Sequence, residues 1–139
     1  MDLFKLKPIT PIEFATLVRP GSPNTYLVCP TGLSDCGPDK TSPIFEQARD
    51  TVLSAWLEMI ERQPRTIETD PSTDGYQRTF VQRTRLLGFP DVITVQFISI
   101  SPESSTLAIY SRSQYGHSDL GANKKRVMAW LSDLENRLG

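Results

Sequence analysis

The sequence is poor in the residues from which metal centres and disulfide frameworks are built. Its 139 residues include two cysteines and one histidine. A structural zinc site takes four Cys or His ligands, so we expect no bound metal, and nothing indicates another cofactor. Cys29 and Cys36 enclose the segment CPTGLSDC. Because a reducing cytoplasm disfavours disulfides, we expect two unlinked thiols in or near a loop, with a disulfide as the alternative.

Long apolar runs and an excess of charge are also missing. No run approaches the roughly 20 apolar residues that a transmembrane helix needs. The first residues, MDLFKLKPITP, lack the signal-peptide pattern, so we expect a cytoplasmic protein unless a leader was removed. Lys and Arg number 15 against 16 Asp and Glu, a net charge of −1. Nucleic-acid-binding domains usually carry a basic face, so we expect no nucleic-acid partner.

The chain length corresponds to one domain preceded by an arm. Residues 1–23 hold four of the eleven prolines, which disfavour helix around themselves. A two-turn helix still fits between Pro11 and Pro20. The arm also carries many apolar side chains, so we expect it to pack on the domain formed by residues 24–139, with a partner's surface as the alternative.

Hydrophobic patterning predicts five strands and the loops between them. The strands are rich in β-branched and aromatic residues. Proline and glycine mark a loop over residues 30–43, and Asp-Gly marks a hairpin turn over 70–75. Another turn is predicted over 101–104. The predicted strands span residues 25–29, 66–69, 76–85, 91–100 and 106–111.

Two segments have helical periodicity. The first spans residues 44–63 and ends before Pro64, with apolar residues on one face at Val52, Leu53, Trp56, Leu57 and Ile60. Its start has two interpretations: Ser42 caps it with Pro43 in the first turn, or residues 44–46 are extended and Asp50 caps it. The last helix has an apolar stripe at Val127, Leu131, Leu134 and Leu138.

This order of elements is strand, helix, four strands, helix. Short turns between the later strands make them antiparallel, and two amphipathic helices need one face of the sheet. The sequence therefore predicts an α+β domain with an antiparallel sheet of four to five strands and two helices on one face. The arrangement is similar to helix-grip or TATA-binding-protein-like folds.

Polar residues gather where the last strand leads into the last helix; we call residues 111–123 the elbow. One interpretation is structural. Asp119 caps the helix, or Asn123 or Ser118 does so instead, and Arg112 pairs with Asp119 or Asp91. Gly116 and Gly121 would serve turns with unusual φ angles.

A second interpretation is functional. A helix N-terminus near Arg112, Lys124 and Arg126 could hold a phosphate or carboxylate. A third makes Arg112, His117 and Asp119 the centre of a hydrolytic or acid–base enzyme, although an exposed His117 is expected. The ligand-binding candidates are Ser111, Arg112, Ser113, Tyr115, His117, Ser118, Asp119, Asn123 and Arg126.

The segment LAIYSRSQYGHSDLGANKKRVMAWL resembles the signature of a bacterial and chloroplast family called domain of unknown function 1499. The matching positions are Ser111, Arg112, Gly116, Ser118, Asp119, Gly121, Asn123 and Arg126. The resemblance extends to FVQRTRLLGFPDVITVQ and covers roughly residues 22–138. It implies a fold and a region of interest, but no reaction. Its chloroplast members suggest a link to membranes.

We therefore expect a binding or accessory module rather than an enzyme. Its ligand would be a small anionic or amphipathic molecule, or its partner a protein. The arginines of the second hairpin strand, Arg78, Arg83 and Arg85, are typical of a solvated face. They could also meet an acidic partner or lipid headgroups, so peripheral membrane contact is a further expectation.

Overall fold

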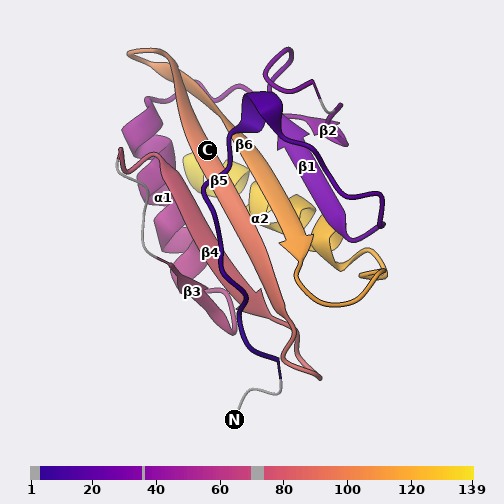
Figure 1. Ribbon diagram of the computed structural model, residues 1–139. Helices are drawn as coiled ribbons and strands as arrows, with labels where there is room; N and C mark the ends of the chain where they lie inside the picture. The colour runs from indigo at the N-terminus through magenta and orange to yellow at the C-terminus, as the bar shows by residue number, and fades with distance from the viewer. Residues whose placement is uncertain (1–3, 36, 70–73) are drawn as a thin grey trace.

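A computed structural model of the chain describes residues 4–35, 37–69 and 74–139. A six-stranded sheet carries both helices on one face (Figure 1). In chain order the elements are a short 3₁₀ helix η1 (Phe14–Thr16), β1 (Thr25–Cys29), β2 (Lys40–Thr41), α1 (Arg49–Glu61), β3 (Thr66–Glu68), β4 (Gln77–Arg83), β5 (Pro90–Ser101), β6 (Ser104–Ser113) and α2 (Ala122–Leu138).

The strands lie in the order β2-β1-β6-β5-β4-β3. Strands β3 to β6 form an antiparallel meander, and β1 joins it by pairing antiparallel with β6. The predicted α+β class is confirmed, but the sheet has six strands instead of four to five and is mixed. The strand missed is β2, which pairs parallel with β1. It has two residues and lies inside the segment whose prolines and glycines predicted a loop.

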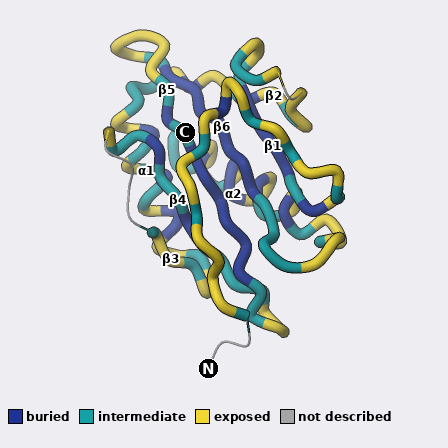
Figure 2. The backbone as a smooth tube through the Cα atoms, in the orientation of Figure 1, coloured by how far each residue is buried: buried dark blue, intermediate teal, exposed yellow. Residues whose placement is uncertain are grey.

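The main core lies between the sheet and the two helices. Side chains alternate across each strand, so Ile93, Val95 and Phe97 of β5 face the helices together. Trp56 of α1 is fully buried and packs against the Phe97 ring and the Trp130 ring of α2. The predicted helical stripes therefore do face the core. Figure 2 shows long buried stretches along β5 and β6.

The other face of the sheet meets the N-terminal segment, which runs across it in Figure 1. A second, smaller core of Leu27, Cys29, Ala108 and Tyr110 lies under Phe14. The backbone amide of Ile12 donates to the Gln77 side chain (3.0 Å). The two-turn helix considered for this segment is a single 3₁₀ turn over Phe14–Thr16.

Helix α1 starts between the two predicted positions, later than a Ser42 cap would give and just before the predicted Asp50 cap. It begins at Arg49 after Ala48, which contributes no capping side chain, and Asp50 lies in its first turn. Instead, a hydrogen bond joins the hydroxyl groups of Ser42 and Thr106 (3.0 Å). Phe45 forms a β-bridge with Ser105, so the extended course predicted for residues 44–46 is correct. Pairing with β6 takes this segment out of the helix.

Two predictions fall on residues that the structure does not describe. The hairpin turn predicted over residues 70–75 includes 70–73. The pairing of the two cysteines involves Cys36, whereas Cys29 is a buried residue of β1. Within the described ranges, no helix has the length and apolar character to cross a membrane.

Candidate functional site

The elbow is held by the side chain of Asp119. Helix α2 begins at Ala122 after Gly121, whose φ of 83° is the left-handed conformation that glycine adopts without strain. The Asp119 carboxylate accepts hydrogen bonds from the backbone amides of Gly121 (2.8 Å) and Asn123 (3.1 Å). The predicted capping bonds exist, although Asp119 lies two residues before the cap position. The protein's own carboxylate therefore occupies the N-terminus of α2.

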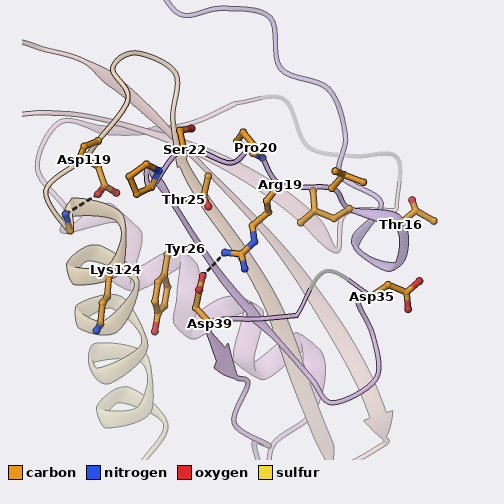
Figure 3. A pocket seen from close by; sticks show the side chains of 15 residues that line it. Thr16, Arg19, Pro20, Ser22, Thr25, Tyr26, Asp35, Asp39, Asp119 and Lys124 are labelled. Atoms are coloured by element: carbon orange, nitrogen blue, oxygen red, sulfur yellow. Dashed lines mark hydrogen bonds and ion pairs between the residues drawn. The ribbon is translucent and has the colours of Figure 1, made fainter.

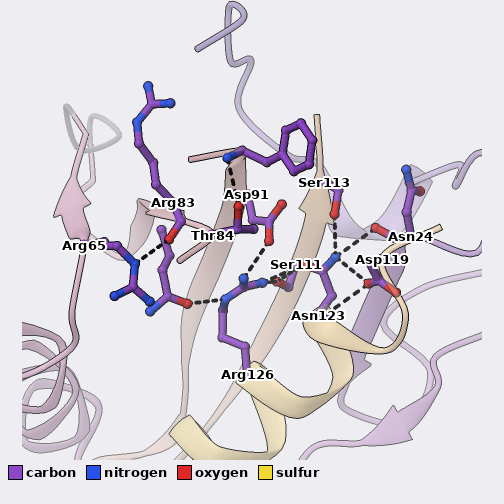
Figure 4. A network of polar contacts seen from close by, with 12 residues as sticks. Asn24, Arg65, Arg83, Thr84, Asp91, Ser111, Ser113, Asp119, Asn123 and Arg126 are labelled. Atoms are coloured by element: carbon purple, nitrogen blue, oxygen red, sulfur yellow. Dashed lines mark hydrogen bonds and ion pairs between the residues drawn. The ribbon is translucent and has the colours of Figure 1, made fainter. Parts of the chain in front are cut away.

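Asn123 is the hub of a buried network (Figure 4). Its side-chain amide donates to the backbone oxygen of Asn24 (3.0 Å), to the Ser113 hydroxyl (3.0 Å) and to the Asp119 carboxylate (2.7 Å). Its carbonyl oxygen accepts from the Ser111 hydroxyl (2.6 Å). Asn123 is fully buried. The network thus joins the start of α2 to β6 and to the residue that precedes β1, with all of these polar groups satisfied.

Arg126, one turn further along α2, extends the network to β5. Its guanidinium forms an ion pair with the Asp91 carboxylate (2.6 Å), and both side chains are almost fully buried. It also donates to the Ser111 hydroxyl and to the carbonyl of Asn123. Its Nε–H donates to the Gln82 side chain of β4. One arginine therefore ties α2 to three neighbouring strands.

The pKa values of the Asp91 and Asp119 carboxyls shift in opposite directions. Burial raises the pKa of Asp91, and the positive charge of Arg126 only partly offsets this. For Asp119, burial also acts to raise the pKa, but the hydrogen bonds from Asn123 and the backbone amides outweigh it and lower the pKa. Asp119 is therefore held as an anion by the protein itself.

Arg112 does not belong to this network. It alternates with Ser111 and Ser113 along β6, so its side chain lies on the opposite face of the sheet. There its guanidinium donates to the Thr94 hydroxyl (3.0 Å) and to the backbone oxygen of Tyr110 (3.1 Å). The predicted ion pair of Arg112 with Asp119 or Asp91 is wrong. The partner of Asp91 is Arg126 instead.

Arg112 is a desolvated cation for which no carboxylate partner occurs among residues 4–35, 37–69 and 74–139. Burial lowers its pKa to about 10, with a smaller opposing effect from Tyr110. The folded state thus binds this proton less tightly than the unfolded chain does. The charged side chain therefore costs stability below pH 10, and the cost fades as the pH rises above that value.

This reasoning predicts that Arg112→Met stabilises the protein. Methionine keeps the long aliphatic stem but removes the buried charge. We expect the free energy of unfolding to rise by about 1 kcal/mol and the thermal midpoint by about 3–5 °C, measured at neutral pH. A fall of similar size would mean that the bonds to Thr94 and Tyr110 outweigh the cost of desolvation.

The remaining sequence candidates lie apart. Tyr115 packs beside Phe4 and donates to the backbone oxygen of Lys5 (2.6 Å). His117 is exposed, as expected. No hydrogen bond joins His117 to Asp119 in the described part of the chain, and both Asp119 oxygens accept other bonds. No cluster of His, Cys, Asp and Glu suited to a metal occurs within that part either.

A groove of about 1190 Å³ opens beside the elbow (Figure 3). One wall is the start of α2, with Ser118, Asp119 and Lys124, and Tyr26 of β1 lies next to it. The opposite wall comes from the segment between η1 and β1 and from the loop before β2. It is lined by Thr16, Leu17, Val18, Arg19, Pro20, Ser22, Pro23, Thr25, Asp35 and Asp39.

Most charges in this groove already have partners. Arg19 forms an ion pair with Asp39 (2.5 Å), and Asp39 also accepts from the backbone amide of Leu27. Asp119 faces the amides of α2. Lys124 is exposed, and no carboxylate pairs with it among the described residues. Burial and the nearby Asp39 raise the pKa of the Tyr26 hydroxyl, so it stays a neutral donor.

Sequence reasoning located one wall of this groove but not the other. Ser118, Asp119 and Lys124 were all in the predicted region. Tyr26, Arg19 and Asp39 were missed because they come from segments that appeared to be strand, arm and loop. Asp39 carried no local signal, since its importance depends on β2 pairing in parallel with β1.

Comparison with known proteins identifies a family and one solved structure. The family described as protein of unknown function (DUF1499) matches residues 6–134, as the signature motif predicted. No curated protein matches the sequence. A START superfamily protein from Mycobacterium smegmatis superposes with a TM-score of 0.41 at 11% identity, over 70% of this chain and 94% of that one. Similarity at this level says nothing of what this chain binds.

Proposed function

We propose that this chain, which belongs to the DUF1499 family of proteins of unknown function, is a non-enzymatic binding module. Its groove beside the elbow would hold a small amphipathic ligand that has an anionic end. The observation that carries the proposal is the position of the groove, of about 1190 Å³, against the start of α2, which the Asn123 network ties to β6. A wall fixed by buried hydrogen bonds loses little entropy on binding.

The ligand would lie beside α2 rather than beneath it. In a helix-grip arrangement, apolar ligands often lie between the sheet and the long helix. Here that space is filled by Trp56, Phe97 and Leu134, which are all completely or almost completely buried. The groove instead combines apolar side chains such as Leu17 and Val18 with polar ones, which is typical of small-molecule sites.

The proposed chemistry of the ligand's charged end follows from Lys124. Lys124 points along the groove next to Tyr26 in Figure 3. The ammonium group favours a carboxylate or phosphate end, whereas the Tyr26 hydroxyl already donates to the Met128 sulfur (3.8 Å). Leu17, Val18 and Pro20 on the opposite wall would contact an apolar tail. Anion binding at the helix N-terminus itself is disfavoured, because Asp119 accepts its amides.

The enzyme alternative lacks support in the geometry. Arg112 lies on the opposite face of the sheet from Asp119, and His117 is exposed. An acid–base pair needs its members within hydrogen-bond reach of each other or of one substrate. The sheet thus separates Arg112 from Asp119, and no hydrogen bond joins His117 to Asp119 among the described residues.

The proposal is tested by titrating the protein with decanoate in a calorimeter, beside Lys124→Glu and Lys125→Glu. Lys124 lines the groove, whereas Lys125 is an exposed neighbour that does not. We expect Lys124→Glu to weaken binding by about tenfold or more, because it turns an attraction into a repulsion. Lys125→Glu should leave the dissociation constant nearly unchanged.

Acetate serves as the control for the apolar tail. It carries the same charged end, so much weaker binding of acetate would show that the groove contacts the chain of decanoate. If wild-type protein gives no heat with decanoate, or if both lysine variants lose affinity equally, the groove is not the binding site.

A further inference from the structure

A second groove, of about 730 Å³, lies at the far edge of the sheet from the first. It is formed by β3, β4 and the loop between β4 and β5. Of the nine large apolar side chains that are exposed among the described residues, four line this groove: Leu6, Ile67, Leu86 and Leu87. We call these four residues and the adjoining arginines the leucine corner.

The two leucines occupy the apex of the loop between β4 and β5. Leu86 is 92% exposed and Leu87 is 55% exposed. Figure 2 shows this end of the molecule as exposed, close to the first described residues of the chain. A group of exposed leucines at one place on the surface indicates that this surface contacts a partner or a membrane when the protein functions.

This loop is rigid enough to present its apex in one conformation. The backbone amide of Thr84 donates to the oxygen of Phe89 (2.9 Å), and that of Gly88 donates to Thr84 (3.1 Å). The hydroxyl of Thr84 accepts from the amide of Phe89 (2.9 Å). The Phe89 ring packs against Phe4. The two leucines therefore project from a turn that is closed by hydrogen bonds.

The charges around the leucines have one sign. The lining residues include Arg65, Arg83 and Arg85 and no carboxylate. Arg65 and Arg85 are exposed, and Arg85 has no partner among the described residues. Arg83, by contrast, donates to the backbone oxygens of Phe4 and Gly88 and so braces the corner. The first groove differs, since three of its lining residues are aspartates.

We propose that the leucine corner is a contact site for an anionic lipid bilayer. Leu86 and Leu87 would enter the interfacial region while Arg65 and Arg85 meet the lipid phosphates. An apolar tip that projects from the surface suits insertion between lipids, whereas an acidic protein would need the apex to lie in a concave partner. Basic residues near a bilayer gain from its negative surface potential, and apolar side chains add affinity by burial.

The test is sedimentation of the intact chain with two kinds of vesicle. One is phosphatidylcholine alone, and the other is an equal mixture of phosphatidylcholine and phosphatidylglycerol. We expect binding to the anionic vesicles that weakens as salt is added, and little binding to the neutral ones. Absence of binding to the anionic vesicles, or equal binding to both kinds, would overturn the proposal.

Two variants and a matched control locate the contact. Arg85→Glu and the pair Leu86→Ser with Leu87→Ser should each lower binding to anionic vesicles by about tenfold or more. Leu120→Ser is the control, because Leu120 is 93% exposed at the elbow, away from this corner. Thermal midpoints should stay unchanged in all of them. If Leu120→Ser loses binding as much as the corner variants do, the corner is not the contact.

Discussion

Arg126→Met is expected to be among the most destabilising single changes in the chain. It would leave the Asp91 carboxylate buried without its cation, since the Asp91 side chain is only 2% exposed. Removing one partner of a buried ion pair costs about 3–5 kcal/mol. The methionine would also leave the Gln82 side chain and the Ser111 hydroxyl without their donor. The free energy of unfolding, measured by urea titration, should fall by that amount.

A second substitution separates the effect of the unpaired Asp91 charge from the effect of the changed side-chain shape at position 126. Asp91→Asn in the Arg126→Met background removes the stranded charge while keeping the volume of the side chain. We expect the double variant to regain about 1–3 kcal/mol relative to Arg126→Met alone. If Arg126→Met costs less than 1 kcal/mol, or if Asp91→Asn worsens it, the ion pair does not hold the helix to the sheet.

Asn123→Leu is the other change with a large expected effect. Leucine has the same number of side-chain heavy atoms and branches at the same carbon, but cannot donate to the Asn24 oxygen, the Ser113 hydroxyl and Asp119, or accept from Ser111. Each buried group left without a partner costs about 1–3 kcal/mol, partly offset by the gain of an apolar contact. We expect a net loss of about 2–4 kcal/mol, seen as a lower urea midpoint.

Lys125→Ala is the matched control for that variant. It lies two residues further along the same helix but is exposed. Its substitution should change the free energy of unfolding by less than about 0.5 kcal/mol. A loss in Asn123→Leu no larger than that of the control would show that the buried network contributes little to the start of α2.

The fold could be predicted from the sequence wherever the local hydrophobic pattern matched the burial that tertiary packing imposes. The alternation of Ile93, Val95 and Phe97 placed β5 and its buried face correctly, because these three side chains pack into the core between the sheet and the helices. Helix α2 was equally clear. The start of α1 was not, because Phe45 pairs with Ser105, and no local signal reveals a bridge between residues so far apart in sequence.

The elbow shows the same division. Asp119 as the group that accepts helix amides followed from its spacing before α2. The choice of partner for Asp91 did not, since Arg126 lies 35 residues further along the chain and no local signal links the two. The alternation of β6 decides it: Ser111 and Ser113 face α2, and so Arg112 faces the N-terminal segment. A strand's two faces separate neighbours in sequence by the thickness of the sheet.

The proposed function is tested most directly by identifying the residues whose signals change when an amphipathic anion binds. The measurement is the change in backbone amide chemical shifts of labelled protein on addition of decanoate. We predict the largest shifts at Tyr26, Ser118 and Lys124 around the first groove, with Arg112 and Tyr115 unchanged on the opposite face. Shifts centred on Arg112 and Tyr115 would contradict the proposal, because they would place the ligand on the other side of the sheet.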